Sequence, residues 1–337
     1  MNLAVLAPNP NDATSFYRSM GPLSRLMKDG VNLEVSLLDE RRVDWWNLRH
    51  CHAILMQRPS TSTHVKIAHT AADMSIPIWV DYDDYLWDVP ASNPAAQFYG
   101  HETRHCMNEL CRLADIITVS TAHLKSLIGA QNQNIRVIKN TVSSDLMARD
   151  SKQLLISPKA GGFMWRGSST HQEDLYGVQP QIMKAMETLE WGWTFCGMQP
   201  WFIFQAAKTL KCEQPKYQEP LDIIRYMRWM EEVKPDCVVV PLHDCDFNRA
   251  KSNIAHVEAA MAGAVTIAPN WEEWDRPGIV NYDAKDPASV YTAMEFVHSL
   301  SLSKRSRMVD EAVNFLKCEE KLALRQRTEL LTELSSK

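Results

Sequence analysis

Short apolar runs alternate with longer amphipathic segments through the first 140 residues of the chain. The apolar runs predict buried strands, since each is bounded by turn-forming or polar residues, and they cover residues 3–7, 33–38, 53–56, 78–81, 116–120 and 135–138. The intervening segments repeat their apolar positions at helical spacing, over residues 16–28, 62–74, 97–114 and 122–128. This alternation predicts a parallel sheet covered by helices.

The second half of the chain repeats the pattern. Strands are expected at residues 163–165, 193–196, 237–241, 266–268 and 279–281, with helices at 172–187, 221–232 and 251–262. Residues 143–159 between the halves are polar and lack a core pattern, which favours a linker. We therefore expect a doubly wound α/β fold with Rossmann-like domains over residues 1–150 and 151–302, a cleft between them, and an amphipathic helix over 303–337 that packs on the fold.

Composition narrows the class of protein. The 337 residues are 45% apolar and 23% charged, which excludes disordered, collagen-like and coiled-coil chains. The net charge of -5, without a basic tract, excludes a highly basic DNA-coating protein. The eight cysteines show no metal-ligand spacing, and neither a signal peptide nor a long apolar run is present. A cytoplasmic protein with reduced thiols and no integral membrane segment is expected.

The most informative segment runs over residues 241–263, from a strand through a polar loop into a helix. Amides at a helix N-terminus, with Arg249 and Lys251 beside them, suit a diphosphate. Seven residues separate Lys251 from Glu258, so both are expected on one helical face, with the carboxylate placed to accept hydrogen bonds from ribose hydroxyls. A surface helix with an ordinary ion pair would explain the same spacing.

This loop and helix resemble the carboxy-terminal signature of retaining GT-B glycosyltransferases that use nucleotide sugars. The resemblance implies that Glu258 holds the donor ribose. It also implies that the preceding loop meets the donor sugar and diphosphate, through Asp246, Phe247, Asn248, Ser252 and Asn253. The chain departs from the commoner motif, because Ala250 stands where that motif has a first glutamate. The role of that glutamate is either vacant or filled by Asp244, Asp246 or Asn248.

Residues 165–175 resemble the first strand, turn and helix of the donor domain in the same family. The resemblance implies that Arg166, Gly167, Ser168 and His171 face the donor diphosphate, helped by the dipole of the following helix. A small-residue turn that caps a helix would explain the glycine and serine equally well. Together with the Lys251 loop, however, this turn would supply the second anion-binding loop that a leaving nucleoside diphosphate requires.

In the first half, residues 15–18 and 80–87 resemble acceptor-domain segments of this family. They supply Tyr17, Arg18, Asp81 and Trp87 as expected acceptor-binding residues, and Asp83 and Asp84 as expected catalytic residues beside Arg166 and Lys251. Three interpretations of the aspartate cluster stay open: it orients an acceptor hydroxyl, binds a divalent metal, or caps turns. The resemblance itself implies no metal cofactor and a nucleoside diphosphate sugar, expected to be a UDP-sugar, as donor.

The reaction implied is transfer of a hexose or pentose with retention, by attack on the face that the diphosphate leaves, with Arg166 and Lys251 stabilising the departing charge. The acceptor is a glycan or lipid-linked sugar, or a hydroxymethylated pyrimidine in DNA, as in compact bacteriophage enzymes of this fold acting in the host cytoplasm. Basic side chains that could line a DNA groove are Arg18, Arg41, Arg42, Arg49 and Arg58. A non-catalytic protein that binds a nucleotide or sugar between two domains is the alternative from another class.

Overall fold

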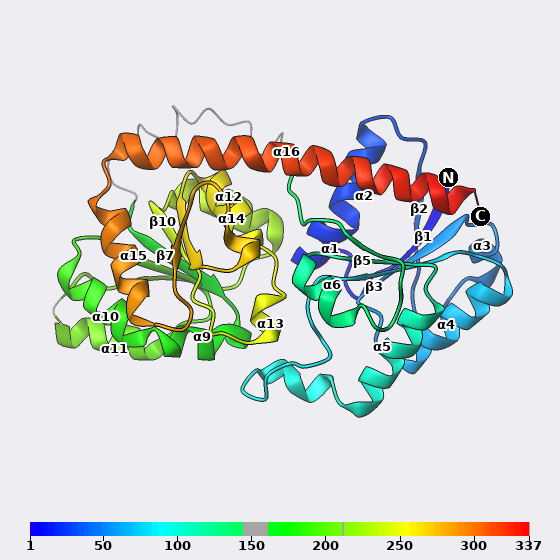
Figure 1. Cartoon of the computed structure of the whole chain (residues 1–337), viewed down its shortest axis with the longest axis horizontal. Helices are drawn as coiled ribbons and strands as arrows, with labels where there is room; N and C mark the ends of the chain where they lie inside the picture. Colours follow the sequence, from blue (N-terminus) through cyan, green and yellow to red (C-terminus); the bar gives the residue numbers. More distant parts are fainter. Residues whose placement is uncertain (144–160, 211, 337) are drawn as a thin grey trace.

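The computed structural model describes residues 1–143, 161–210 and 212–336, which form two α/β units lying side by side and one long helix that crosses both (Figure 1). The predicted linker at residues 143–159 and the predicted boundary at residue 150 lie outside the described residues, apart from Ser143.

The first sheet contains six parallel strands in the order β2-β1-β3-β4-β5-β6. Its strands are β1 (Asn2–Leu6), β2 (Glu34–Leu37), β3 (Ala53–Gln57), β4 (Ile78–Tyr82), β5 (Ile116–Val119) and β6 (Ile135–Val137). The three central strands β3, β4 and β5 are buried at every position, which is why they appear in the sequence as continuous apolar runs. Each strand lies within one residue of its predicted bounds.

The helices of this unit are α1 (Ala13–Arg18), α2 (Met20–Lys28), α3 (Trp45–Leu48), α4 (Ser62–Asp73), η1 (Pro94–Phe98), α5 (His101–Leu113) and α6 (Ala122–Ile128). Two predicted helices are broken. The helix expected at 16–28 is interrupted at Ser19, whose backbone (φ -119°, ψ -74°) departs from helical geometry. The helix expected at 97–114 is split because the extended Gly100 begins α5 as its N-cap.

The second sheet also has six parallel strands, in the order β12-β11-β10-β7-β8-β9. Its strands are β7 (Phe163–Gly167), β8 (Trp193–Gly197), β9 (Lys216–Gln218), β10 (Cys237–Val239), β11 (Val265–Pro269) and β12 (Ile279–Tyr282). Only β9 was not predicted. It is a short edge strand without a buried residue, so it has no apolar run to mark it.

The helices around this sheet are η2 (Ser169–His171), α9 (Gln172–Gly177), α10 (Gln179–Thr188), α11 (Trp201–Leu210), α12 (Ile223–Val233), α13 (Asp246–Arg249), α14 (Ile254–Ala262), η3 (Glu272–Trp274) and α15 (Ala288–Ser299). The helix predicted at 251–262 begins only at Ile254, so Lys251 lies in the loop before α14 and not on its face. Its end is as predicted, since Gly263 adopts the left-handed conformation (φ 81°) that terminates helices.

The last helix, α16 (Leu302–Ser335), extends over both units (Figure 1). Its first half buries Val309, Ala312 and Leu316 against the core of the second unit. Its last turns bury Leu330 and Leu334 in the same cluster as Leu3 of β1. The helix therefore ties the two units together along one side of the molecule.

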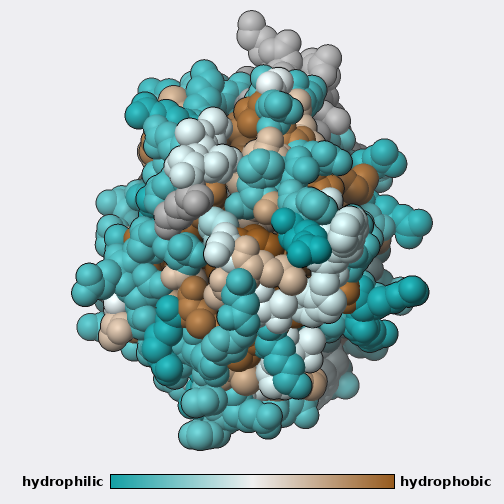
Figure 2. Space-filling view, turned by 90° about the vertical axis from the view of Figure 1, so that its right-hand side faces the viewer, coloured by the Kyte–Doolittle hydropathy of each residue, from teal (hydrophilic) through white to brown (hydrophobic). Residues whose placement is uncertain are grey.

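The end of the first unit that carries α3 is mostly hydrophilic, with small hydrophobic areas between polar ones (Figure 2). Arg41, Arg42 and Arg49 are exposed around α3, at the far end of the molecule from the second unit in Figure 1. Arg18 is buried. The prediction that Arg18 could line a DNA groove is therefore wrong, whereas Arg58 lines the cavity between the two units. No helix among the described residues is long and apolar enough to cross a bilayer.

Candidate active site

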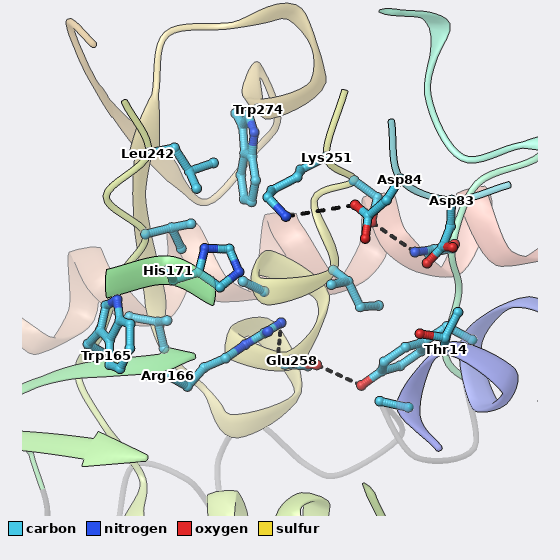
Figure 3. A pocket seen from close by; sticks show the side chains of 18 of the residues that line it. Thr14, Asp83, Asp84, Trp165, Arg166, His171, Leu242, Lys251, Glu258 and Trp274 are labelled. Atoms are coloured by element: carbon cyan, nitrogen blue, oxygen red, sulfur yellow. Dashed lines mark hydrogen bonds and ion pairs between the residues drawn. The ribbon is translucent and has the colours of Figure 1, made fainter. Parts of the chain in front are cut away.

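A cavity opens between the two units, where the carboxyl ends of strands from both sheets meet (Figure 3). It holds about 960 Å³ of empty space, part of it open to solvent. The polar side chains that line it come from both units: Thr14, Tyr17, Arg58, Asp83, Asp84, Asn140, Arg166, His171, Lys251, Ser252 and Glu258. This edge is where open α/β sheets bind their ligands, and eight of the seventeen predicted site residues line the cavity there.

Glu258 on α14 is the centre of a buried cluster. Its side chain is only 5% exposed and forms a 2.7 Å ion pair with Arg166 at the end of β7. Tyr17 of α1 donates to Oε1 at 2.6 Å, and Tyr226 of α12 donates to Oε2 at 3.1 Å. Burial, and then the Glu258 charge, raise the pKa of both tyrosines, which keeps both phenols protonated as donors. A ribose hydroxyl would therefore have to share Glu258 with three donors that already bind it.

Tyr17 was expected to bind the acceptor but instead reaches across to this predicted donor residue. Its hydrogen bond to Glu258 is one of several polar contacts between the units. Asn140 of the first unit donates to Ser252 of the second at 2.8 Å. Side chains that line the cavity therefore also connect the two units to each other.

Lys251 projects into the cavity from the loop between α13 and α14. Its Nζ lies 3.8 Å from Asp84 Oδ1 of the first unit and 4.4 Å from the centre of the Phe247 ring. Phe247 therefore supports Lys251 from behind and does not line the cavity, which corrects its prediction as a donor contact. The cation itself does face the cavity, as predicted.

Asp83 and Asp84 follow β4 and share one arginine. Arg58 Nη2 lies 2.7 Å from Asp83 Oδ2 and 2.7 Å from Asp84 Oδ2. Burial raises the pKa of Asp83, against the opposing effect of Arg58. Burial acts in the same sense on Asp84, but Lys251 and then Arg58 outweigh it and lower the pKa of that carboxyl. These carboxylates bind cationic side chains inside the cavity, which does not favour the turn-capping interpretation.

Three predicted acceptor-binding residues do not line the cavity. Arg18 and Asp81, 2% and 3% exposed, form an ion pair inside the first unit, with Arg18 Nε donating to Asp81 Oδ2 at 3.0 Å. The indole of Trp87 packs against Tyr82 and donates to Asn108 at 2.6 Å. Arg18 and Asp81 are buried, so the prediction that they contact an acceptor is wrong, whereas Trp87 is partly exposed and its role stays a prediction.

Fewer residues of the loop before α14 line the cavity than the resemblance implied. Asp246 is exposed and lies 3.1 Å from His123 Nε2 of the first unit. Asn248 is buried and donates to Asp174 Oδ1 at 2.7 Å. Asn253 is buried at the start of α14. None of Asp246, Asn248 and Asn253 lines the cavity, whereas Ser252 does.

The position of the missing first glutamate is packed against the first unit. Ala250 is fully buried, and its carbonyl accepts a hydrogen bond from Thr121 Oγ1 at 2.9 Å. Asp244 pairs with Arg249, away from the cavity. The loop therefore supplies no carboxylate to the cavity in place of that glutamate.

A second cavity of about 1160 Å³ adjoins the first and shares Arg166, His171 and Glu258 with it. Gly167 and Ser168 line this second cavity, beside Gly197, Ile223 and Tyr226. The backbone at Gly197 has φ 98°, and a Cβ there would lie 2.3 Å from the Gly167 carbonyl oxygen. The two glycines thus let β7 and β8 end close together beneath this cavity.

Three residues that shape the site were not predicted as catalytic or donor-binding residues, although Arg58 was named as a side chain that could line a DNA groove. Arg58 directly follows β3, so the rule that ligands bind at the carboxyl ends of strands could have placed it in the cavity. Tyr226 and Asp174 lie on helices and carry no local signal, because their role depends on partners from other elements. Among the described residues, no group of three or more His, Cys, Asp or Glu side chains is arranged to hold a metal ion.

Two six-stranded parallel sheets that face each other across a cavity, joined by a terminal helix, define the GT-B class of two-domain folds. Neither protein-family models nor curated sequences give a match to the chain. Solved structures do match over almost the whole length. An alpha-glucosyltransferase in complex with UDP and a 13-mer DNA containing a central A:G mismatch is 13% identical, with a TM-score of 0.67, and the match covers 98% of this chain and 99% of that one.

Two other solved structures match over a similar length. HepE of Anabaena, in complex with UDP-glucose, is 12% identical with a TM-score of 0.62, over 99% of this chain and 100% of that one. A putative UDP-N-acetylglucosamine 2-epimerase from Listeria monocytogenes is 11% identical with a TM-score of 0.60, over 98% and 97% of the two chains. At these identities the likeness establishes the fold alone, and the predicted GT-B fold is confirmed.

Proposed function

We propose that the protein transfers a sugar from a nucleotide-sugar donor, a UDP-sugar, to the hydroxyl of a hydroxymethylated pyrimidine in DNA, with retention and without a catalytic metal. One observation carries this proposal. Arg166 and Lys251 of the second unit line the same cavity as Asp84 of the first unit. Two cations that could stabilise a leaving diphosphate therefore lie opposite a carboxylate that could orient an attacking hydroxyl.

The donor would occupy the second unit, proposed as residues 151–302. Its diphosphate would lie between Arg166 and Lys251, whose charges stabilise the negative charge that builds up as the sugar leaves. The nucleoside would extend into the second cavity past Gly167 and Ser168. UDP and UDP-glucose are named in complexes of proteins with this fold, which supports a uridine donor.

The acceptor would approach from the first unit, proposed as residues 1–150, with the helix over 303–337 joining the two. Asp84 and Asp83 would orient the attacking hydroxyl on the face that the diphosphate leaves. A DNA acceptor is supported by the alpha-glucosyltransferase of this fold whose complex contains a 13-mer DNA with a HMU base. The reaction would then take place in the cytoplasm, that of the host cell if a bacteriophage encodes the protein.

The test combines UDP-glucose with DNA containing hydroxymethylcytosine or hydroxymethyluracil and measures released UDP. Lys251→Ala is expected to lower kcat by about a hundredfold, the usual loss when one group that stabilises developing charge is removed. Lys66→Ala, the same change at an exposed position on α4, serves as the control and is expected to leave the rate unchanged. Activity that survives excess EDTA would support the metal-free reaction.

Two outcomes would contradict the proposal in different ways. Failure to bind any nucleoside diphosphate or nucleotide sugar would overturn the donor assignment. Tight binding of UDP-glucose without transfer to DNA, glycan or water would instead favour the non-catalytic two-domain binding protein.

A further inference from the structure

His171 occupies the place where the two cavities join. It lines both of them, and it lies with Arg166 and Lys251 on the second unit's side of the first cavity (Figure 3). Its Nδ1 is 3.0 Å from Asp174 Oδ2, one turn further along the chain. The imidazole is therefore anchored on one nitrogen inside the protein while its ring borders the space proposed for the donor.

Asp174 forms hydrogen bonds with residues of both loops of the proposed donor site. Its side chain is 4% exposed, and Oδ1 accepts hydrogen bonds from His243 Nδ1 at 2.6 Å, from the His243 backbone N–H at 3.1 Å and from Asn248 Nδ2 at 2.7 Å. Through Asp174, the segment that carries His171 is thus fixed to the loop that leads to Lys251.

The same hydrogen bonds determine which nitrogen of His171 carries the proton. Burial acts to raise the pKa of Asp174, but the hydrogen bonds from His171 and His243 hold that pKa well below its usual range. The carboxylate is therefore ionised and can only accept hydrogen bonds. Nδ1 of His171 must then be the donor. The other nitrogen, Nε2, is left for a ligand, as a lone pair when the ring is neutral and as a donor when it is charged.

Four charged groups face His171, and the Asp174 carboxylate that binds it also binds His243. Asp174 approaches from α9, Arg166 from β7, Lys251 from the loop before α14 and Asp84 from the loop after β4. Burial, and then the Lys251 charge, lower the pKa of His171, outweighing the opposing effect of Asp174. The ring is therefore neutral near pH 7 while the cavity holds no anion.

A nucleotide sugar reverses this balance. Its diphosphate brings two negative charges next to Arg166 and Lys251, which offsets the repulsion that, after burial, lowers the pKa of His171. We propose that His171 takes up a proton from solvent when a diphosphate enters, and that Asp174 is the positioning residue that aims its Nε2–H at a phosphate oxygen. The inference rests on the proposed nucleotide-sugar donor and adds a third cation, present only when the donor is bound.

The experiment is isothermal titration calorimetry of the full chain with UDP-glucose, in buffers of different ionisation enthalpy, at about pH 7.5. UDP-glucose is the probe because its phosphates do not titrate near neutral pH. The wild-type protein is expected to take up close to one proton per bound ligand, and its Kd to rise by up to about tenfold per pH unit on the alkaline side. His171→Gln is expected to bind more weakly and to take up no proton.

His171→Lys is the matched variant, because it keeps a cation but removes the titration near neutral pH. It is expected to bind UDP-glucose without proton uptake and with a Kd independent of pH from about 6 to 8.5. Asp174→Asn is expected to lose uptake while UDP-glucose still binds. Because Asp174 also binds His243 and Asn248, the thermal unfolding of Asp174→Asn is compared with that of wild type, and His171→Gln and His171→Lys decide the matter if Asp174→Asn does not fold.

The outcomes separate this inference from the proposed function. Binding without proton uptake by the wild type, or uptake that persists in His171→Gln, would overturn the role of His171 and leave the donor assignment standing. Absence of UDP-glucose binding by the wild type at every pH would overturn both.

Discussion

Asp81→Asn is the substitution that most clearly separates a structural role from an acceptor-binding one. Asp81 accepts hydrogen bonds from Arg18 Nε, Arg18 Nη2 and Thr118 Oγ1, and it is 3% exposed. The asparagine would remove the charge and turn an NH₂ donor toward groups that already donate. The buried Arg18 would be left without an anion, close to the equally buried Arg327 of α16.

The expected cost is about 3–5 kcal/mol, the usual range when one partner of a buried ion pair is removed. Urea unfolding at neutral pH measures it. Asp29→Asn is the control, because it makes the same chemical change in an exposed pair with Arg25 four residues away and should cost less than about 0.5 kcal/mol. If Asp81→Asn costs less than about 1 kcal/mol but raises the KM for the acceptor, the structural interpretation is refuted and the original acceptor-binding prediction is right.

Three further substitutions test residues in and around the proposed donor site. Gly167→Ala is expected to weaken UDP-glucose binding at least about tenfold, because the new Cβ would lie 2.7 Å from the buried Trp165 ring, and titration calorimetry that finds unchanged affinity would disprove this. Glu258→Gln is expected to destabilise the fold by about 2–4 kcal/mol in urea unfolding, since Arg166 loses its anion, and a loss below about 1 kcal/mol would mean that the phenols alone hold the cluster. Hydrogen bonding to Asp174 raises the pKa of His243 to about 10, so the stability it contributes is complete below about pH 6.5 and is lost as the pH rises through about 10. His243→Gln should remove that decline, and equal pH slopes for variant and wild type would contradict the assignment.

The sheets could be predicted because burial on both faces leaves a continuous apolar run. Eleven of the strands lie within two residues of their expected bounds, and the exception, β9, has no buried residue. Helix boundaries were less certain. Lys251 was expected on α14 because helical spacing continues through it, but the helix starts at Ile254 and has no side-chain N-cap hydrogen bond to mark its beginning.

The sequence could predict which cations line the candidate site, but not which side chains pair with one another. Arg166 lies at the end of β7, Lys251 in the loop before α14 and Glu258 on α14, so the order of elements places them near the sheet edge that lines the cavity. Whether a charged residue faces that cavity or the interior depends on partners distant in sequence. Arg18 and Asp81 are 63 positions apart, and no spacing rule distinguishes their buried pair from two ligands at a surface. Tyr17 and Tyr226 reach Glu258 from two different units for the same reason.

The central claim is that this cavity transfers a sugar to a hydroxymethylated base in DNA. The most direct measurement incubates the protein with UDP-glucose and duplex DNA containing hydroxymethylcytosine, digests the DNA to nucleosides and weighs them by mass spectrometry. The account predicts a hydroxymethyldeoxycytidine nucleoside heavier by one hexose unit, formed by wild type and Lys66→Ala and nearly absent with Lys251→Ala. Unmodified nucleosides from every hydroxymethylated DNA, under conditions where UDP-glucose is bound, would contradict it.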